Sequence, residues 1–412
     1  MRWSKLSWNV VWGFAFVACS PGGLSPVAQR NVMSESTIDK GAFLKGARNF
    51  SKENSYTQFE QWCEDTNLTP GALKTINALR NQNFLKKQAQ LSCAELEQKL
   101  QNAKIIDLTG AFLSDLRPLS DLRAVEILHL GDNDINEIEP LSGLANLREV
   151  DLRKNRISKA KALGKLTNLR RLTLCDNPLE DFSFLKPLKR LELLNLKKTQ
   201  FYVESLKWLP ANLETLILSY NKLSSVNGFP ILSKLRSLYL DNNELHSIKN
   251  IPRLNLLRTF DLATNVLTHF DYEHDLPQLR VLDLNENELN TLQFSNAMPE
   301  LRELLVVRNK IKTLDNLSRF PKLENLTLQQ NFISDVAPLA SIQSLKFLDL
   351  RQNNIENVQP LSALVKLKIL SLASNRIENA EVIMKLKNLQ FLFLEGNPAA
   401  KAPCELPRGE CR

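Results

Sequence analysis

Aliphatic residues recur at fixed intervals along most of the chain, and an asparagine marks each interval. Successive asparagines are 22 residues apart, except for one step of 44 that passes over Thr199. The marked positions are Asn133, Asn155, Asn177, Asn221, Asn243, Asn265, Asn287, Asn309, Asn331, Asn353, Asn375 and Asn397. One further step back reaches Ala111, behind the strand-like segment 106–108. The period predicts about fourteen structural repeats over residues 103–400.

Aliphatic side chains occupy constant offsets around each asparagine. Around Asn155 they are Leu147, Val150 and Leu152 before it and Ile157 after it. Residues five and three before the asparagine alternate as in a short strand with one face inside. Later apolar residues lie about three apart, which is the spacing of 3₁₀ turns. We therefore expect a parallel sheet on one side, 3₁₀ or irregular segments on the other, and a core that forms only by stacking.

The asparagine side chain is expected to lie inside the stack. Its amide both donates and accepts hydrogen bonds, so a column of asparagines can satisfy buried backbone groups between repeats. Thr199 replaces it in one repeat, where Tyr202, Trp208 and Pro210 crowd the outer side. Because a hydroxyl forms fewer hydrogen bonds than an amide, we expect a kink or bulge in this repeat. The alternative is that the replacement leaves the structure of the repeat unchanged.

The pattern Leu-x-x-Leu-x-Leu-x-x-Asn-x-Leu resembles the leucine-rich repeat, and its period is similar to the 22-residue repeats of bacterial internalins. The resemblance covers residues 103–400. It implies an α/β solenoid, an arc with a concave parallel β-sheet and a 3₁₀ or irregular convex side. It also implies a scaffold for binding rather than catalysis, with a protein or glycan partner on the concave face.

Both ends of such a solenoid need covering, because the terminal repeats expose apolar surface. Residues 40–102 are predicted to form a helical N-terminal cap. Thr69-Pro70 is typical of a helix start, and Ser92 followed by Glu95 is typical of a capping box. Residues 401–412 are predicted to form a C-terminal cap or tail.

The first residues are typical of an export signal. Arg2 and Lys5 precede an apolar run over residues 6–18, which is too short to span a bilayer. The sequence Phe16-Val17-Ala18-Cys19 resembles the lipobox of bacterial lipoproteins, although Phe16 stands where leucine is usual. The resemblance implies removal of residues 1–18 and lipidation of Cys19; an ordinary secreted protein cleaved near Ala18 is the alternative.

We expect residues 19–39 to form a flexible tether, because the segment is rich in proline, glycine and serine and poor in apolar residues. The predicted protein is exported to the cell envelope and touches the membrane through its lipid anchor only. In a Gram-negative cell the resemblance implies sorting to the outer membrane, on either of its sides.

The cysteines are distributed in pairs at the two ends. In an exported protein these pairs suggest Cys63–Cys93 and Cys404–Cys411 disulfides, with free thiols as the alternative. Their spacing, without a nearby histidine, does not suit zinc. Cys175 is left over on an outward strand position, as a small residue or a reactive thiol.

Residues six, four and two before each asparagine point out of the concave sheet. They are not needed for the core, so their side chains can serve ligand binding. Aspartates and a glutamate gather around the middle repeats, an arginine row runs beside them, and aromatic residues gather near the C-terminal end. The candidate ligand-binding residues are Tyr239, Asp241, Arg258, Asp261, Arg280, Asp283, Arg302, Glu303, Phe347, Phe391 and Phe393. Two interpretations stay open: a self-paired ladder of arginine and aspartate, or a binding surface with aromatic anchors. The C-terminal aromatics could alternatively be covered by the tail.

Composition narrows the function classes further. The formal charge of +8 falls to +6 once the signal is removed, and the basic residues are interspersed with acidic ones. We therefore expect no nucleic-acid partner. Neither a metal, a cofactor nor an enzyme activity is expected, and the protein is expected to be monomeric. Two alternative functions stay open. One is a hydrolase, for which His129 near Asp107 and Asp151 is a weak basis, and the other is a structural envelope lipoprotein without a ligand.

Overall fold

The chain divides into two units, residues 1–55 and residues 56–412. The computed structural model describes the second unit over residues 58–82, 91–315, 317–401, 406 and 410–411. The predicted signal, Cys19, the tether, Cys404 and the side chain of Cys411 lie outside the described residues.

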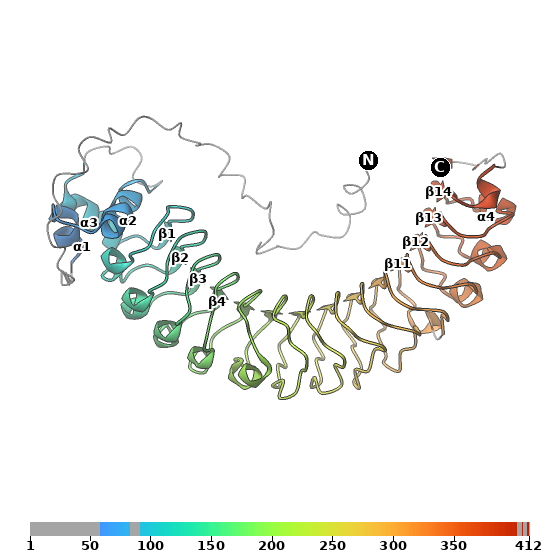
Figure 1. Cartoon of the computed structure of the whole chain (residues 1–412), viewed down its shortest axis with the longest axis horizontal. Helices are drawn as coiled ribbons and strands as arrows, with labels where there is room; N and C mark the ends of the chain where they lie inside the picture. Colours follow the sequence, from blue (N-terminus) through green and yellow to red (C-terminus); the bar gives the residue numbers. More distant parts are fainter. Residues whose placement is uncertain (1–57, 83–90, 316, 402–405, 407–409, 412) are drawn as a thin grey trace. The chain divides into compact units, whose positions relative to one another are not determined.

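One parallel sheet runs through the described unit and forms an open arc (Figure 1). Its strands follow the sequence order, and from β1 to β14 each pairs with the next at an offset of 22 residues, as in Ile105↔Ile127, whereas β15 pairs with β14 at an offset of 19, as in Phe391↔Glu410. The strands are β1 Ile105–Asp107, β2 Ile127–His129, β3 Glu149–Asp151, β4 Arg171–Thr173, β5 Leu193–Asn195, β6 Thr215–Ile217, β7 Ser237–Tyr239, β8 Thr259–Asp261, β9 Val281–Asp283, β10 Glu303–Leu305, β11 Asn325–Thr327, β12 Phe347–Asp349, β13 Ile369–Ser371, β14 Phe391–Phe393 and β15 Glu410–Cys411. The predicted solenoid with a parallel sheet is confirmed.

Short 3₁₀ helices form the convex side towards both ends, while the middle repeats are extended (Figure 1). Prolines explain part of this division: Pro118, Pro140, Pro338 and Pro360 each stand in the first turn of a 3₁₀ helix, where a fixed φ helps and a missing N–H costs nothing. The segments are η2 Arg117–Leu119, η3 Glu139–Gly143, η4 Lys161–Lys165, η5 Ser183–Leu185, η6 Val203–Trp208, η7 Leu317–Arg319, η8 Ala337–Ser341, η9 Gln359–Ala363, the short α4 Glu381–Met384 and η10 Pro398–Lys401.

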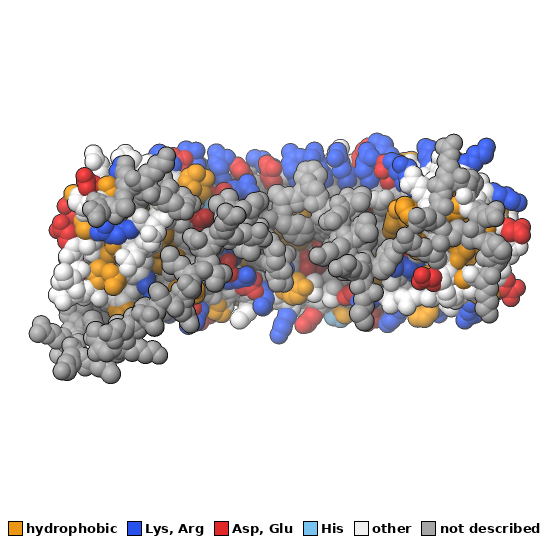
Figure 2. Space-filling model, turned by 90° about the horizontal axis from the view of Figure 1, so that it is seen from above, with side chains coloured by type: hydrophobic (Ala, Val, Ile, Leu, Met, Phe, Trp, Pro, Cys, Tyr) orange, Lys and Arg blue, Asp and Glu red, His pale blue; other side chains and the backbone are white. Residues whose placement is uncertain are grey.

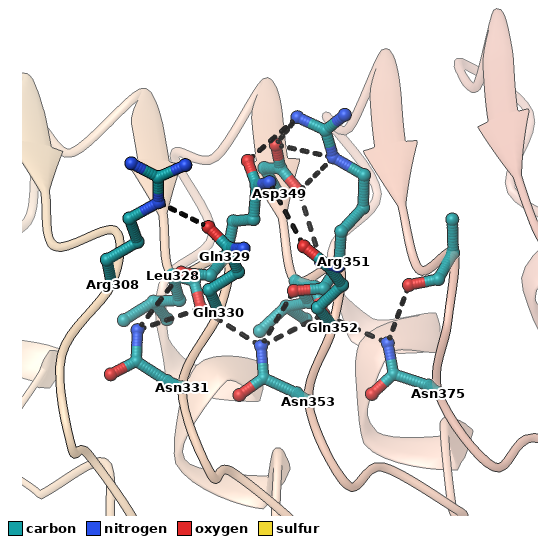
Figure 3. Close-up of polar contacts among 12 residues, drawn as sticks. Arg308, Leu328, Gln329, Gln330, Asn331, Asp349, Arg351, Gln352, Asn353 and Asn375 are labelled. Carbon is teal, nitrogen blue, oxygen red and sulfur yellow. Dashed lines mark hydrogen bonds and ion pairs between the residues drawn. The ribbon is translucent and has the colours of Figure 1, made fainter.

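The asparagine column joins neighbouring repeats from inside. The Nδ2 group of Asn265 donates to the carbonyls of Leu240 and Leu262, at 3.0 Å each, and its Oδ1 accepts from the N–H of Leu245 at 3.0 Å. Leu240 and Leu245 belong to the preceding repeat, so one side chain holds two repeats together. Figure 3 shows the donated bonds repeated at Asn331 and Asn353.

The repeat at Thr199 keeps the sheet regular, so the expected kink or bulge is wrong for the sheet. The Thr199 hydroxyl donates to the carbonyl of Leu196 at 2.7 Å, and its backbone N–H donates to Asn221 Oδ1 at 2.9 Å. Strands β5 and β6 stay in register, with Leu194 opposite Leu216. The next asparagine supplies the acceptor, so a hydroxyl suffices in this repeat.

A left-handed residue precedes every position of the asparagine column. Gly110 and Gly396 take this place in the first and last repeats, but residues such as Thr264 (φ 53°) and Arg308 (φ 54°) take it elsewhere. This conformation costs a non-glycine residue roughly 1–2 kcal/mol. The bonds of the following asparagine hold the chain in it.

Three helices precede β1: α1 Phe59–Glu64, α2 Pro70–Arg80 and α3 Cys93–Gln101. The Thr69 hydroxyl accepts from the first turn of α2, and Ser92 with Glu95 forms a complete capping box at α3. The structure pairs Cys63 with Cys93, which links α1 to α3. At the other end of the arc, β15 adds to β14. No helix in the described part of the chain is long and apolar enough to cross a membrane.

We predict that Asn265→Ala lowers the free energy of unfolding by about 3 kcal/mol, because it orphans buried backbone groups of two repeats. Asn265→Thr should cost less, since Thr199 shows that a hydroxyl still reaches the carbonyl of its own repeat. Urea unfolding followed by circular dichroism measures both. Asn250→Ala is the control, because Asn250 is exposed and bonds only to the side chain of Asn227 among the described residues. Equal costs for the Ala variants at 265 and 250 would contradict this account.

Candidate functional site

Tyr239, Asp261 and Asp283 lie side by side on the concave face of the middle strands. The register of β7, β8 and β9 places Tyr239 opposite Asp261 and Asp261 opposite Asp283. Asp241 follows β7 on the same face. We refer to Asp241, Asp261 and Asp283 as the acidic cluster.

The aspartates of the strand ends have a structural duty that the sequence analysis missed. Asp261 accepts a hydrogen bond from the backbone N–H of Ala263 at 3.1 Å, and Asp283 accepts one from Asn285 at 2.9 Å. Asp151 and Asp349 make the same bond in their repeats, as does Asn195. This local turn explains why aspartate or asparagine recurs four before the column.

The same turns differ in how the carboxylate is neutralised. Asp349 is paired with Arg351, two residues on, at 2.6 Å (Figure 3), and Asp151 is paired with Arg153 at 3.3 Å. At Asp261 and Asp283 the residue two on is alanine or asparagine. Neither carboxylate has an ion pair among the described residues. The chain thus leaves these two carboxylates without an ion pair, although the charge of Lys197 acts on Asp261.

Burial and mutual repulsion raise the pKa values of these two carboxyls. Burial is the main cause at Asp261, and the charges of Asp241 and Asp283 add to it, so the pKa rises well above its usual range. Burial also raises the pKa of Asp283 to about 7, with contributions from Asp241 and Glu286. A cation placed between them would relieve both effects.

Aromatic and hydroxyl groups border the acidic cluster. The pKa of Tyr239 is raised, mainly by burial and then by the charge of Asp261. Asp241 accepts hydrogen bonds from Ser219 Oγ and from Asn242 Nδ2. Lys197 lies over the ring of Tyr220, with Nζ 4.8 Å from the ring centroid.

The expected mixed ladder of arginines and concave aspartates does not form. At the ends of the arginine row, Arg236 pairs with Glu214 at 3.3 Å and Arg302 pairs with Glu324 at 3.1 Å. No described ion pair joins Arg258 or Arg280 to the acidic cluster. The acids and the arginines are therefore two separate surfaces, because the arginines precede the strands and the aspartates end them.

Glu303 lies beside this surface but has a different environment. Its Oε1 accepts from Asn325 Nδ2 at 3.0 Å, while Oε2 is buried without a hydrogen-bond partner. Burial raises its pKa.

Near the C-terminal end, register places Phe347, Ile369 and Phe391 in one row, and Phe391 keeps 37% of its surface exposed. Strand β15 pairs with β14 next to this row, so the tail reaches it without removing Phe391 from solvent.

Cys175 differs from its expected state. Its side chain is buried and disulfide-bonded, with a partner sulfur outside the described side chains, so it is neither a free thiol nor an exposed strand residue.

His129 Nε2 lies 3.5 Å from Glu149 Oε1, and register places it between Asp107 and Asp151. No hydroxyl or thiol bonds to His129 in the described part of the chain. No group of three potential metal ligands occurs there either.

Comparison with known proteins identifies the repeats. The model for leucine-rich repeats (two copies) matches residues 145–187 and 343–383. The two matched segments are leucine-rich repeats, and the chain has a fold that solved leucine-rich repeat solenoids share. No curated protein sequence matches it.

Two bacterial structures are similar along most of the chain. An internalin (inlF) of Listeria monocytogenes has 24% identity and a TM-score of 0.63, over 86% of this chain and 97% of that one. A leucine-rich repeat protein of Leptospira interrogans has 25% identity and a TM-score of 0.59, over 76% and 97%. The ectodomain of the Arabidopsis thaliana receptor kinase GASSHO1/SCHENGEN3, solved with CASPARIAN STRIP INTEGRITY FACTOR 2, has 23% identity and a TM-score of 0.52, over 71% and 43%.

We predict that Asp283→Asn makes the protein more stable at pH 8 and leaves it about unchanged at pH 4. The folded chain holds the Asp283 proton up to a pKa of about 7, against 3.8 in the unfolded chain. The native state therefore binds more protons between these values, and stability falls as the pH rises through them. The amide avoids this loss, and a gain of about 1–2 kcal/mol is expected at pH 8.

Asp349→Asn is the matched control, because Asp349 has the same place in its repeat and the same backbone bond but also pairs with Arg351. It should lower stability at pH 8. Chemical unfolding at the two pH values decides: a loss of stability in Asp283→Asn at pH 8 contradicts the prediction.

Proposed function

We propose that this protein is a non-enzymatic binding protein whose concave sheet recognises a protein partner through a basic segment of that partner. The observation that carries the proposal is the contrast within one column. Asp151 and Asp349 have their own arginine, whereas Asp261 and Asp283 have none. An arginine or lysine of a partner would supply the missing cation, and Tyr239 would offer an adjacent ring.

Support for a protein partner also comes from the fold. A stacked parallel sheet presents a wide, rigid surface on which side chains keep a fixed spacing. The plant receptor ectodomain was solved in complex with CASPARIAN STRIP INTEGRITY FACTOR 2. His129 has carboxylate neighbours but no nucleophile beside it among the described residues, which leaves the hydrolase alternative without support.

We further propose that the protein belongs to the internalin-like class with 22-residue repeats and acts in the bacterial cell envelope. The constant offset between paired strands supports the class. The basic and apolar start and the residues before Cys19 support an exported, lipid-anchored, monomeric protein, at the outer membrane in a Gram-negative cell.

The partner test compares capture by immobilised wild-type protein with capture by variants. A partner should be retained by the wild type and by Asp349→Asn, and lost with Asp261→Asn/Asp283→Asn or with Tyr239→Ala. Its affinity should rise about tenfold from pH 6 to pH 8, because a cation binds the ionised form of Asp283. Asp241, Asp261 and Glu286 are the acids that face this carboxyl, and Lys197 acts on Asp261. Equal retention by all variants would show that the concave assignment is wrong.

The anchor is tested separately, by the mass of the mature N-terminus from membranes. We expect a chain that begins at Cys19 and carries the mass of a diacylglyceryl group, and a Cys19→Ser variant that leaves the membrane fraction. A mature chain with an unmodified Cys19 would contradict the lipoprotein assignment while leaving the binding proposal untouched.

A further inference from the structure

Arginine stands directly before four successive strands, at Arg236, Arg258, Arg280 and Arg302. Their backbones form one hydrogen-bonded chain: each of the last three donates its N–H to the carbonyl of the arginine before it, at 2.8–2.9 Å. Successive arginines are therefore about 5 Å apart at the backbone, the distance between neighbouring strands. The row lies along the edge of the sheet at which the strands begin.

In the described part of the chain the row forms ion pairs only at its ends, although the charge of Arg280 also acts on Glu300, which is itself paired with Lys322. Glu214 pairs with Arg236 and Glu324 pairs with Arg302. Among the described residues the guanidinium groups of Arg258 and Arg280 have neither an ion pair nor a hydrogen-bond partner, and both side chains are exposed. Two neighbouring cations at this spacing repel each other, so the protein maintains an unfavourable charge arrangement in the middle of the row.

The same edge continues into a shallow depression of about 230 Å³. Its charged lining residues are Arg170, Lys189, Arg190, Glu192, Glu214 and Lys234. Glu192 is paired with Arg170 and Glu214 with Arg236, which leaves Lys189, Arg190 and Lys234 without an ion pair among the described residues; Arg190 donates instead to Asn168 Oδ1 at 2.6 Å. We refer to Lys189, Lys234, Arg236, Arg258, Arg280 and Arg302 as the basic edge. In the view from above, Lys and Arg side chains line one long edge of the described unit (Figure 2).

We propose that the basic edge is a second binding surface, separate from the concave site, for a linear polysaccharide that carries sulfate or carboxylate groups. A row of evenly spaced cations matches a polymer with evenly spaced anions. Each guanidinium can bind a sulfate or carboxylate through two parallel hydrogen bonds. Such a ligand would offset the repulsion between cations along the whole row. A single small anion would offset it at one point of the row only.

The chemistry of the edge favours a polysaccharide over other polyanions. None of its six residues is aromatic, and neither is any residue that lines the depression. Single-stranded nucleic acids are bound mainly by stacking on aromatic side chains, which this edge does not offer. Peripheral membrane binding combines basic with apolar side chains that enter the interface, and no residue that lines the depression is apolar.

The test measures binding of a fluorescent heparin fragment to the full chain by anisotropy, with neutral dextran as the blank. Arg258→Gln/Arg280→Gln should weaken binding about tenfold or more and reduce the slope of log K against log salt by about 2, because two cations no longer release counterions. The variant should fold normally, since neither side chain has a partner in the described structure. Lys222→Gln/Lys312→Gln removes the same charge from the opposite edge, where the strands have ended, and should bind like the wild type.

Three outcomes would overturn the proposal. They are equal weakening by both double variants, no binding of heparin above dextran, and tighter binding of single-stranded DNA or of phosphatidylserine vesicles than of heparin at equal charge. Asp261→Asn/Asp283→Asn should bind heparin at least as well as the wild type, whereas Arg258→Gln/Arg280→Gln should still capture the concave partner. The two surfaces can therefore fail independently.

Discussion

The hydrogen bonds of the asparagine column are the interaction on which the rest of the structure depends. No repeat has a core of its own, so each must be fixed to the one before it. Asn265 does this by bonding to carbonyls of two repeats and to one backbone N–H. Its bonds also offset the cost of a left-handed residue directly before it, as at Thr264. Strand register and the even spacing of outward residues on the concave face follow from this repeated contact.

Because the inward positions are committed to this stack, function is left to the outward ones. Those positions are themselves constrained: the aspartates that end the strands also close a local turn with the residue two on. An acidic residue on the sheet is thus no evidence for a ligand by itself. The informative feature is the absence of the compensating arginine at Asp261 and Asp283, compared with Asp349. At the other end of the strands, two arginines of the row likewise have no ion pair.

Much of the architecture could be predicted from the sequence, because it depends on the spacing of apolar residues and asparagines along the chain. The 22-residue register, the inward leucines and the capping box at Ser92 follow from local patterns. The left-handed residues could not be predicted, since Thr264 and Arg308 have no preference for that conformation. At Thr199 the backbone N–H donates to Asn221 Oδ1 in the next repeat, and Cys175 is disulfide-bonded; neither contact follows from local sequence. A self-paired ladder of arginines and aspartates was one of two open interpretations, because their columns are neighbours on the sheet, but opposite ends of a strand keep the two columns apart.

The central claim is that the concave sheet contains carboxylates that the chain does not neutralise. The most direct measurement is an NMR titration of the aspartate side-chain carboxyl carbons, with Asp283→Asn used for assignment. The account predicts that Asp283 titrates near 7 in the free protein, and that its signal moves to the ionised position at lower pH once a basic partner binds. Titration of both Asp261 and Asp283 near the ordinary value of 3.8 would contradict the claim.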